Sequence, residues 1–241
     1  MPLAWHLATV AELHPETAGA TTLVLDVADW PGHLAGQHVD VRLTAEDGYQ
    51  SQRSYSIASA PGDARLALTV ERFDDGEVSP YLTDEVRPGD QFELRGPIGG
   101  YFTWQVADGG PLLLLGGGSG LVPLASMLRH RAEASSDVDA SLLVSARTWA
   151  SVLYGDELAA HARRGVDVRY TLTREQPPDW TGWTGRVTSE MLRGVGPDPT
   201  RAPRIFVCGP TGFVEHVARL LVALGHEPHT IKTERFGPTG G

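Results

Sequence analysis

The sequence contains a single cysteine, Cys208, among its 241 residues. One thiol excludes an internal disulfide, a four-thiolate iron–sulfur cluster and a cysteine-rich zinc site. The histidines and carboxylates show no HExxH or comparable spacing, so no metal site is predicted. Apolar runs are also short. The most apolar stretch, residues 111–115, stops at glycines, whereas a bilayer-spanning helix needs roughly 20 residues, so no membrane insertion is predicted.

Positive charge is scarce and is carried almost entirely by arginine. Lys232 is the one lysine, and 20 Lys and Arg residues stand against 30 Asp and Glu residues, which gives a formal net charge of -10. This balance disfavours nucleic acid as a partner, because nucleic-acid binding relies on basic surfaces. The first residues lack a positively charged segment followed by a long apolar core, so no signal peptide is predicted and a cytoplasmic location is expected.

The first half of the chain has the pattern of a β-domain. The length and composition of the whole chain suit a globular protein of one large domain or two compact ones. Pro-Gly and Asp-Gly turns separate short segments that alternate polar with apolar residues, which predicts an antiparallel barrel or sandwich. The expected strands include residues 21–27, 38–43, 54–58 and 65–71, and a short helix is expected near 78–85.

The second half alternates buried strands with helices, which predicts a parallel sheet covered on both faces. Strands are expected at residues 111–115, 141–145, 166–173 and 204–208, and helices at 121–134, 156–163, 189–193 and 213–224. The predicted fold class is therefore β followed by α/β, with the first domain at residues 1–107 and the second at 108–241.

Two glycine elements follow strands of the second half. Residues 116–123 read GGGSGLVP between the apolar run and a helix, and Gly209-Pro210 follows the strand that ends at Cys208. Absent side chains would leave backbone N–H groups free to bind a phosphate, and the helix N-terminus adds partial positive charge. Strand ends in an open parallel sheet border one crevice, so both elements could line it. The alternative is a pair of glycine-rich turns without a ligand, with Cys208 a small buried residue.

A polar motif, RSYS, occupies residues 53–56 of the first half. Strand alternation places Arg53 and Tyr55 on one face and Ser54 and Ser56 on the other. A guanidinium can neutralise a diphosphate, a tyrosine can stack on a planar ring, and a serine hydroxyl can bond a ring nitrogen. The alternative is an ordinary barrel strand with outward polar side chains.

Four motifs occur in one order along the chain: RSYS, GEVSPYL at residues 76–82, GGSGLVP, and CGP at 208–210. This combination resembles the ferredoxin–NADP reductase family over nearly the whole chain. The resemblance implies an FAD-binding antiparallel β-barrel followed by an NAD(P)-binding α/β domain. Members of that family transfer hydride between a nicotinamide and the flavin, and pass single electrons to or from a separate carrier.

The resemblance also implies individual roles. Arg53 would bind the FAD diphosphate, Tyr55 would stack on the isoalloxazine, and Ser56 would approach its N5. Cys208 would face the nicotinamide, which makes Tyr55, Ser56 and Cys208 the expected catalytic residues. Glu71 departs from the lysine that is frequent in the family, so its role stays open. The cofactor-binding residues implied are Arg53, Ser54, Tyr55, Ser56, Thr69, Val70, Glu77, Val78, Ser79, Gly117, Gly118, Ser119, Gly120, Cys208, Gly209 and Pro210.

Selectivity for NADPH or NADH depends on the ends of the next strands. No carboxylate follows the strand at 141–145, where Arg147 stands instead, and Thr173-Arg174 resembles the family's Ser/Arg pair for a 2′-phosphate. Arg186 lies near a second phosphate-contact region, in a looser match. Because arginine suits a phosphate better than a diol, NADPH is favoured, with NADH possible. The alternative is that these arginines are merely solvated.

The C-terminal residues and the partner are the least determined. Phe236 is the aromatic expected to cover the flavin, or else to pack in the last strand, and the five residues after it resemble a bacterial extension. Glu234 is expected to be a surface carboxylate, with proton relay to the flavin as the alternative, and the nine histidines are expected to be surface or structurally satisfied groups. The predicted partner is a separate ferredoxin, flavodoxin, or oxygenase or molybdoenzyme component. A flavin reductase and a non-catalytic regulatory subunit remain the alternative functions.

Overall fold

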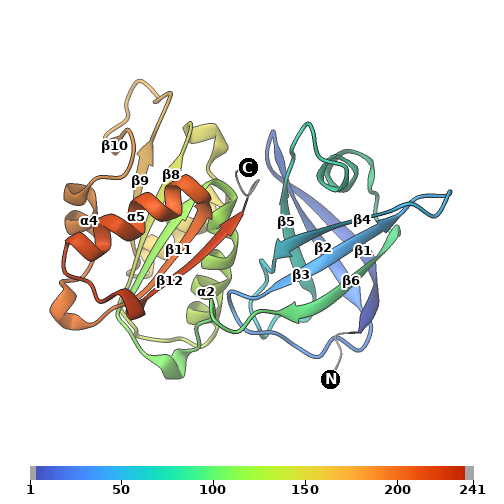
Figure 1. Ribbon diagram of the computed structural model, residues 1–241, viewed down its shortest axis with the longest axis horizontal. Coiled ribbons are helices and arrows are strands. Elements are labelled where there is room, and N and C mark those ends of the chain that lie inside the picture. The colour runs from blue at the N-terminus through green and yellow to red at the C-terminus, as the bar shows by residue number, and fades with distance from the viewer. Residues whose placement is uncertain (1–3, 237–241) are drawn as a thin grey trace.

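The N-terminal half forms a six-stranded antiparallel sheet in the order β4-β3-β6-β1-β2-β5. The computed structural model describes residues 4–236 (Figure 1). A bridge between Ile57 and Leu68 joins the end of β4 to β5, so the two edges of the sheet approach each other as in a barrel. The strands are β1 (Trp5–Thr17), β2 (Ala20–Val27), β3 (His38–Thr44), β4 (Gln50–Ser56), β5 (Leu66–Glu71) and β6 (Gln91–Ile98).

Alternating apolar residues of these strands fill the inside of the barrel. Leu23, Val39 and Leu68 are fully buried in one cluster, as the period of two in their strands requires. A short helix, α1 (Val78–Pro80), continues as the π-helical turn η1 (Tyr81–Glu85) and adds Val78 and Leu82 to the same cluster. The predicted antiparallel barrel and the helix near 78–85 are confirmed, although β4 begins four residues earlier than expected.

The C-terminal half forms a six-stranded parallel sheet in the order β10-β9-β8-β7-β11-β12. The strand order reverses at β7, the first strand of this sheet in the chain. Ligands bind at such switch points in open α/β sheets, beyond the carboxyl ends of the strands. The strands are β7 (Leu112–Gly117), β8 (Ala140–Ala146), β9 (Asp167–Leu172), β10 (Trp183–Thr184), β11 (Arg204–Pro210) and β12 (Ile231–Phe236).

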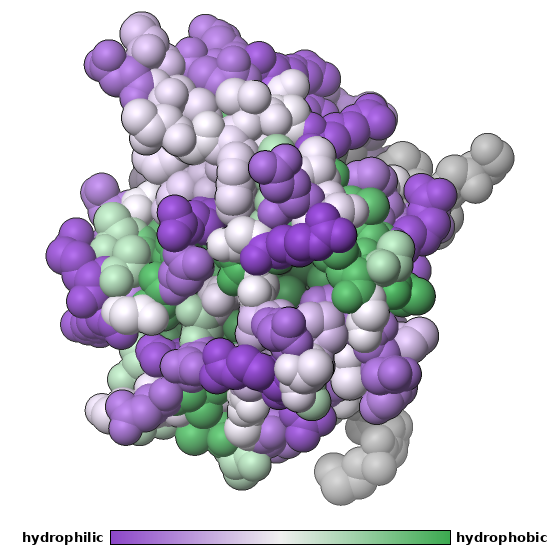
Figure 2. All heavy atoms as spheres, turned by 90° about the vertical axis from the view of Figure 1, so that its left-hand side faces the viewer, coloured by the Kyte–Doolittle hydropathy of each residue, from purple (hydrophilic) through white to green (hydrophobic). Residues whose placement is uncertain are grey.

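Helices cover both faces of the parallel sheet, as predicted. Leu112 and Leu114 of β7 belong to a core cluster with α2 and α3, whereas Leu113 and Leu115 belong to one with α4 and α5. The surface of this unit turned away from the barrel is a mosaic of hydrophilic and hydrophobic residues (Figure 2). The helices are α2 (Leu121–Glu133), α3 (Gly155–Arg163), α4 (Ser189–Val195) and α5 (Thr211–Ala223), with short 3-10 turns η2 (Val106–Asp108), η3 (Gly118–Gly120), η4 (Trp149–Ser151), η5 (Pro199–Arg201) and η6 (Pro228–Thr230).

The two units lie side by side, with α2 and the end of β12 next to the barrel (Figure 1). The Arg129 guanidinium donates to the carbonyl oxygen of Ala58 at 2.6 Å, and the Ser126 hydroxyl donates to that of Ser59 at 2.7 Å. At the other end, the Lys232 ammonium donates to the carbonyl oxygen of Thr103 at 3.0 Å. These hydrogen bonds hold the barrel and the α/β unit against each other. Within residues 4–236, no helix combines the length and the apolar character that crossing a membrane requires.

Candidate functional site

A crevice of about 470 Å³ lies where the barrel meets the carboxyl ends of β7, β8, β11 and β12. The barrel contributes the turn between β1 and β2 and the end of β5, and the α/β unit contributes the opposite wall. Its charged lining residues in the described chain are Glu71, beside the glycine turn, and Arg147, after β8. The lining consists of Thr17, Ala18, Gly19, Ala20, Glu71, Phe73, Gly117, Gly118, Ser119, Ser145, Ala146, Arg147, Thr148, Ala150, Ser151, Leu153, Thr173, Pro210, Phe213 and Phe236.

The glycine turn is shaped by close backbone approaches that a side chain would block. A Cβ on Gly120 would collide with the carbonyl group of Cys208, and one on Gly117 would lie 2.9 Å from the Phe213 ring. Gly118 has a φ of +57°, which L side chains rarely adopt. The structure therefore brings both glycine elements of the sequence together at one edge of the sheet. The bare backbone of the turn fits a phosphate-bearing dinucleotide laid along the crevice.

Strand pairing places Ser56 and Cys208, predicted from separate motifs, each beside one partner of a contact between the two units. His38 pairs with Ser56 across β3 and β4, and Glu234 pairs with Cys208 across β11 and β12. The His38 Nδ1 atom lies 3.6 Å from the Glu234 Oε1 atom and bridges the two units. Directly paired residues share a face of the sheet. Ser56 is therefore the cross-strand neighbour of His38, and Cys208 is the cross-strand neighbour of Glu234.

Burial shifts the pKa values of three residues around this contact, Glu234, His38 and Cys208. Desolvation raises the pKa of Glu234 to about 7 and, as the largest influence, lowers the pKa of His38. Glu234 Oε2 is buried and has no hydrogen-bond partner within the described residues. Desolvation, followed by the nearby Glu234, also raises the pKa of the Cys208 thiol. Between the lowered pKa of His38 and the raised pKa of Glu234, the pair is thus held as a neutral imidazole and a neutral carboxyl, and the carboxyl keeps its proton.

The expectation that Glu234 is a surface carboxylate is therefore wrong. Its side chain is only 27% exposed and contacts His38, the first residue of β3. The end of β12 runs next to the barrel (Figure 1). All nine histidines were expected to be surface or structurally satisfied groups. That expectation does not anticipate the contact between His38 and Glu234. Alternation along β12 cannot signal this contact, since His38 belongs to the other unit.

The RSYS motif lies on β4 as predicted, but its four side chains differ in surroundings. Arg53 is exposed and donates to the carbonyl oxygen of Gln52 at 2.7 Å, and no carboxylate pairs with it among the described residues. Tyr55 is half-buried against the barrel core, and burial raises its pKa. The Ser54 hydroxyl donates to Asp40 at 2.5 Å, so it is already engaged within the barrel.

The β5 and α1 segments flank the same side of the barrel. Beyond Leu68, no strand among residues 4–236 pairs with the outer edge of β5, where Thr69 and Val70 are buried residues. Ser79 is buried, and its hydroxyl accepts the Phe73 N–H at 3.1 Å. Val78 belongs to the barrel core.

Glu77 lies at the rim of a second hollow, of about 730 Å³, near the start of β4. Its carboxylate accepts hydrogen bonds from Ser51 at 2.8 Å and from Tyr49 at 3.1 Å, which lower its pKa. Ser51 stands two residues before Arg53 and therefore on the same face of the strand. The exposed Arg53 thus lies between this hollow and Tyr55.

The residues predicted for the nicotinamide dinucleotide fall into three groups. Residues of the first group line the crevice: Gly117, Gly118, Ser119, Arg147, Thr173, Pro210 and Phe236. Arg174 and Arg186 are exposed and do not belong to that lining. Gly120 and Gly209 lie behind the lining and permit the close approach of the two turns. The extension expected after Phe236 lies outside the described residues.

Several lining residues escaped sequence analysis. The turn at 17–20 reads as an ordinary hairpin connection, and nothing in it signals a wall of the crevice. Phe73 and Phe213 lie close to predicted motifs, and their aromatic character next to glycine turns was an available signal. Within the described residues, His, Cys, Asp and Glu do not form a cluster of three or more suited to a metal ion.

Comparisons with known proteins match both halves of the chain. The Oxidoreductase FAD-binding domain model matches residues 19–103, and the Oxidoreductase NAD-binding domain model matches residues 114–219. The chain is 34% identical over 240 residues to ferredoxin–NADP reductase B of Sorangium cellulosum, which covers 95% of this chain and 96% of that protein.

Two further relatives are named as reductases of oxygenases. The glycine betaine monooxygenase reductase subunit of Chromohalobacter salexigens is 32% identical over 211 residues, covering 85% of this chain and 56% of that protein. The chain thus spans little more than half the length of that subunit. The crystal structure of an Amycolatopsis cytochrome P450 reductase superposes with a TM-score of 0.85 at 28% identity, covering 99% of this chain and 72% of that one. Both domain models match in chain order, and one relative aligns over nearly its whole length; the chain therefore belongs to the ferredoxin–NADP reductase family of FAD-binding and NAD(P)-binding oxidoreductases.

Proposed function

We propose that the chain is an NADPH-dependent reductase that holds FAD in its barrel and delivers electrons one at a time to a separate redox protein. The observation that supports the proposal is the His38–Glu234 contact between the units, which has Ser56 paired beside His38 in the barrel and Cys208 paired beside Glu234 in the α/β unit. Bound FAD would supply the chemistry, accepting a hydride from the nicotinamide and releasing single electrons. The chain supplies binding and orientation, and Glu234 holds a proton near that centre.

The barrel surface suits FAD along its whole length. Arg53, which forms no ion pair with a carboxylate among residues 4–236, would neutralise the diphosphate with charge-assisted hydrogen bonds. Tyr55 would stack against the isoalloxazine, and the backbone of β5 would bond its polar edge. The hollow bordered by Ser51 and Glu77 would accept the adenosine half. We propose domain limits of 1–107 and 108–241, with these groups in the first unit and the crevice wall that carries Ser119 in the second.

The charge of the crevice supports NADPH over NADH. Arg147, at the end of β8, is the cation of the lining, and Thr173 stands next to it on the same rim. The residues that follow β8 in the lining carry no carboxylate to hold a ribose diol. We infer that Arg147 and Thr173 meet the 2′-phosphate, with the exposed Arg174 and Arg186 contributing from outside the lining.

The partner is proposed from charge and from the names of the relatives. A formal net charge of -10 opposes docking onto an acidic ferredoxin or flavodoxin. Two of the proteins similar to this chain are named as a monooxygenase reductase subunit and a cytochrome P450 reductase. An oxygenase component is therefore the acceptor that we favour, ahead of a carrier protein or a molybdoenzyme component.

A titration of the purified protein with NADPH and with NADH, with ferricyanide as acceptor, tests the proposal. A yellow protein that turns over at lower NADPH than NADH concentrations is expected. A colourless protein that reduces only added flavin would identify a flavin reductase instead. Bound FAD with negligible turnover would identify a regulatory subunit, and equal turnover with both nucleotides would remove the NADPH preference.

A further inference from the structure

Tyr154 occupies a conformation that its residue type avoids. It precedes α3 with φ 56° and ψ 31°, in the left-handed region, and its side chain is almost fully buried at 5% exposure. Bulky L-residues are rare in this region because Cβ crowds the backbone, so surrounding contacts must hold the residue there. The ring lies under the Arg129 guanidinium, 4.6 Å from the ring centre.

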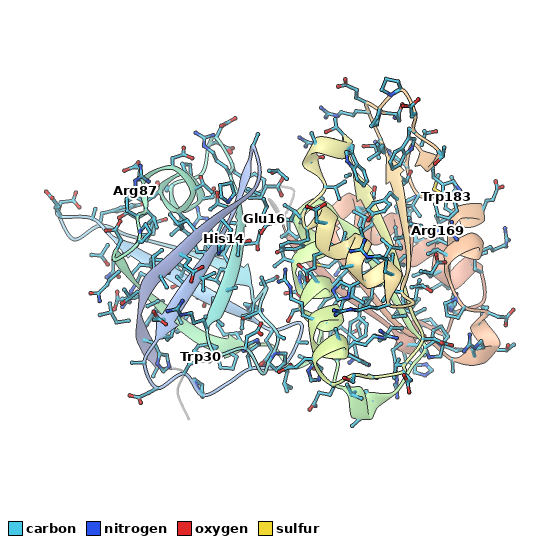
Figure 3. All side chains as sticks on the ribbon, turned by 180° about the vertical axis from the view of Figure 1, so that it is seen from behind. His14, Glu16, Trp30, Arg87, Arg169 and Trp183 are labelled. Carbon is cyan, nitrogen blue, oxygen red and sulfur yellow. The ribbon has the colours of Figure 1, made fainter. Side chains whose placement is uncertain are left out.

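The hydroxyl of Tyr154 begins a chain of hydrogen bonds that enters the barrel. It donates to Thr69 Oγ1 on β5. The hydroxyls of Thr69 and Thr22 lie 2.7 Å apart, and the Thr22 hydroxyl donates to Glu16 Oε1 at 2.7 Å. The direction is consistent along the chain, because each hydroxyl donates once and the last acceptor is a carboxylate. Glu16 lies on the flank of the barrel that faces the α/β unit (Figure 3).

Ionisation does not interrupt this chain at neutral pH. Burial raises the pKa of Tyr154 to about 12, so the phenol keeps its proton and remains a donor. Ionisation of the phenol therefore does not remove the donor at neutral pH.

The bond between Tyr154 and Thr69 ties the two walls of the crevice together. Thr69 precedes the lining residue Glu71 by two positions on β5, and Tyr154 directly follows the lining residue Leu153. Ser126 makes the comparable bond between units, to Ser59. Neither bonded pair is itself part of the lining, but Thr69 and Tyr154 each stand within two residues of it, and Ser59 and Ser126 do not. Loss of the Tyr154 bond would thus free the crevice walls, whereas loss of the Ser126 bond would not.

We propose that Tyr154 is a positioning residue for hydride transfer: its bond to Thr69 fixes the distance between the wall that carries the flavin and the wall that carries the nicotinamide. The proposal rests on the function proposed above. Hydride transfer depends steeply on the geometry of donor and acceptor, and a misplacement of about 1 Å can cost about 100-fold in rate. One hydroxyl behind the crevice lining can therefore control the rate without touching either ring.

The test compares Tyr154→Phe with Ser126→Ala, since each removes one buried hydrogen bond between the units. Anaerobic stopped-flow mixing with NADPH is expected to show flavin reduction slowed by about tenfold or more in Tyr154→Phe, with unchanged NADPH dissociation constant. The nicotinamide–flavin charge-transfer band should weaken in the same variant. Ser126→Ala should keep the wild-type rate and band. Without cofactors, amide hydrogen exchange at residues 148–154 should accelerate in Tyr154→Phe alone.

Thr69 gives a second test that does not depend on the folding of the tyrosine variant. Thr69→Val removes the acceptor and keeps the shape, and should slow reduction as Tyr154→Phe does, whereas Thr69→Ser should restore the rate. Equal rates in Tyr154→Phe, Ser126→Ala and wild type would overturn the inference, as would an equal loss in both variants. A wild-type protein that NADPH does not reduce would instead overturn the proposed function.

Discussion

The carboxyl of Glu234 is the group whose replacement tests the buried pair most sharply. Burial raises its pKa from 4.5 to about 7. Between these pH values the folded protein keeps a proton that the unfolded chain has released, so stability falls as the pH rises through this window. Glu234→Gln keeps the size of the side chain and removes the titration. The stability of the variant should therefore stay level where that of the wild type declines.

The interval from 4.5 to about 7 sets the size of the effect. At about 1.36 kcal/mol for each pH unit, it corresponds to about 3 kcal/mol as an upper bound. The side chain is 27% exposed, so water screens part of the cost and about 2 kcal/mol is the expected difference. His38 acts in the opposite direction, because burial lowers the pKa of its imidazole and stability then rises with pH between that lowered pKa and 6.5. Wild type and Glu234→Gln both carry His38, so its contribution drops out of the difference between them.

Urea unfolding of wild type and Glu234→Gln, followed by tryptophan fluorescence at about pH 5 and about pH 8, measures this difference. The wild type should lose about 2 kcal/mol more than the variant between the two conditions. The matched control is Glu227→Gln, which alters an exposed glutamate of the same unit and should behave as the wild type does. Parallel pH profiles for wild type and Glu234→Gln would refute the reasoning.

Three further substitutions test other parts of the site. Ser56→Ala should slow flavin reduction by about one to three orders of magnitude while FAD stays bound, and an unchanged stopped-flow rate would defeat its assigned role. Gly120→Ala forces a Cβ into the Cys208 carbonyl and should cost about 2 kcal/mol or more in thermal unfolding. Gly212→Ala, with open space around the added atom, is its control, and an equal cost in both would contradict the packing argument. Arg147→Ala should raise the KM for NADPH by about tenfold and spare that for NADH; equal changes in both would remove Arg147 from the phosphate site.

Local patterns were sufficient to predict the fold and the glycine turns. The run at 112–115 is buried on both faces, so it reads as a central parallel strand from composition alone. The glycines next to it are required by backbone contacts within the same unit, such as that between Gly120 and Cys208. Features that depend on neighbouring residues in the chain, or on one sheet, were therefore accessible to sequence analysis.

Features that depend on the packing of one unit against the other were not. The turn at 17–20 becomes a crevice wall only because the barrel is docked beside the end of β8. Glu234 contacts His38 only when β3 of the barrel lies beside it, and Tyr154 reaches Thr69 across 85 residues of sequence. No periodicity within a single strand or helix carries that information.

Anaerobic mixing of the FAD-loaded protein with NADPH tests most directly whether the two units present a nicotinamide to a flavin. The geometry around Ser56 and Cys208 predicts rapid loss of the oxidised flavin absorbance, accompanied by a charge-transfer band between the two rings. Flavin that stays oxidised with both NADPH and NADH would contradict the account.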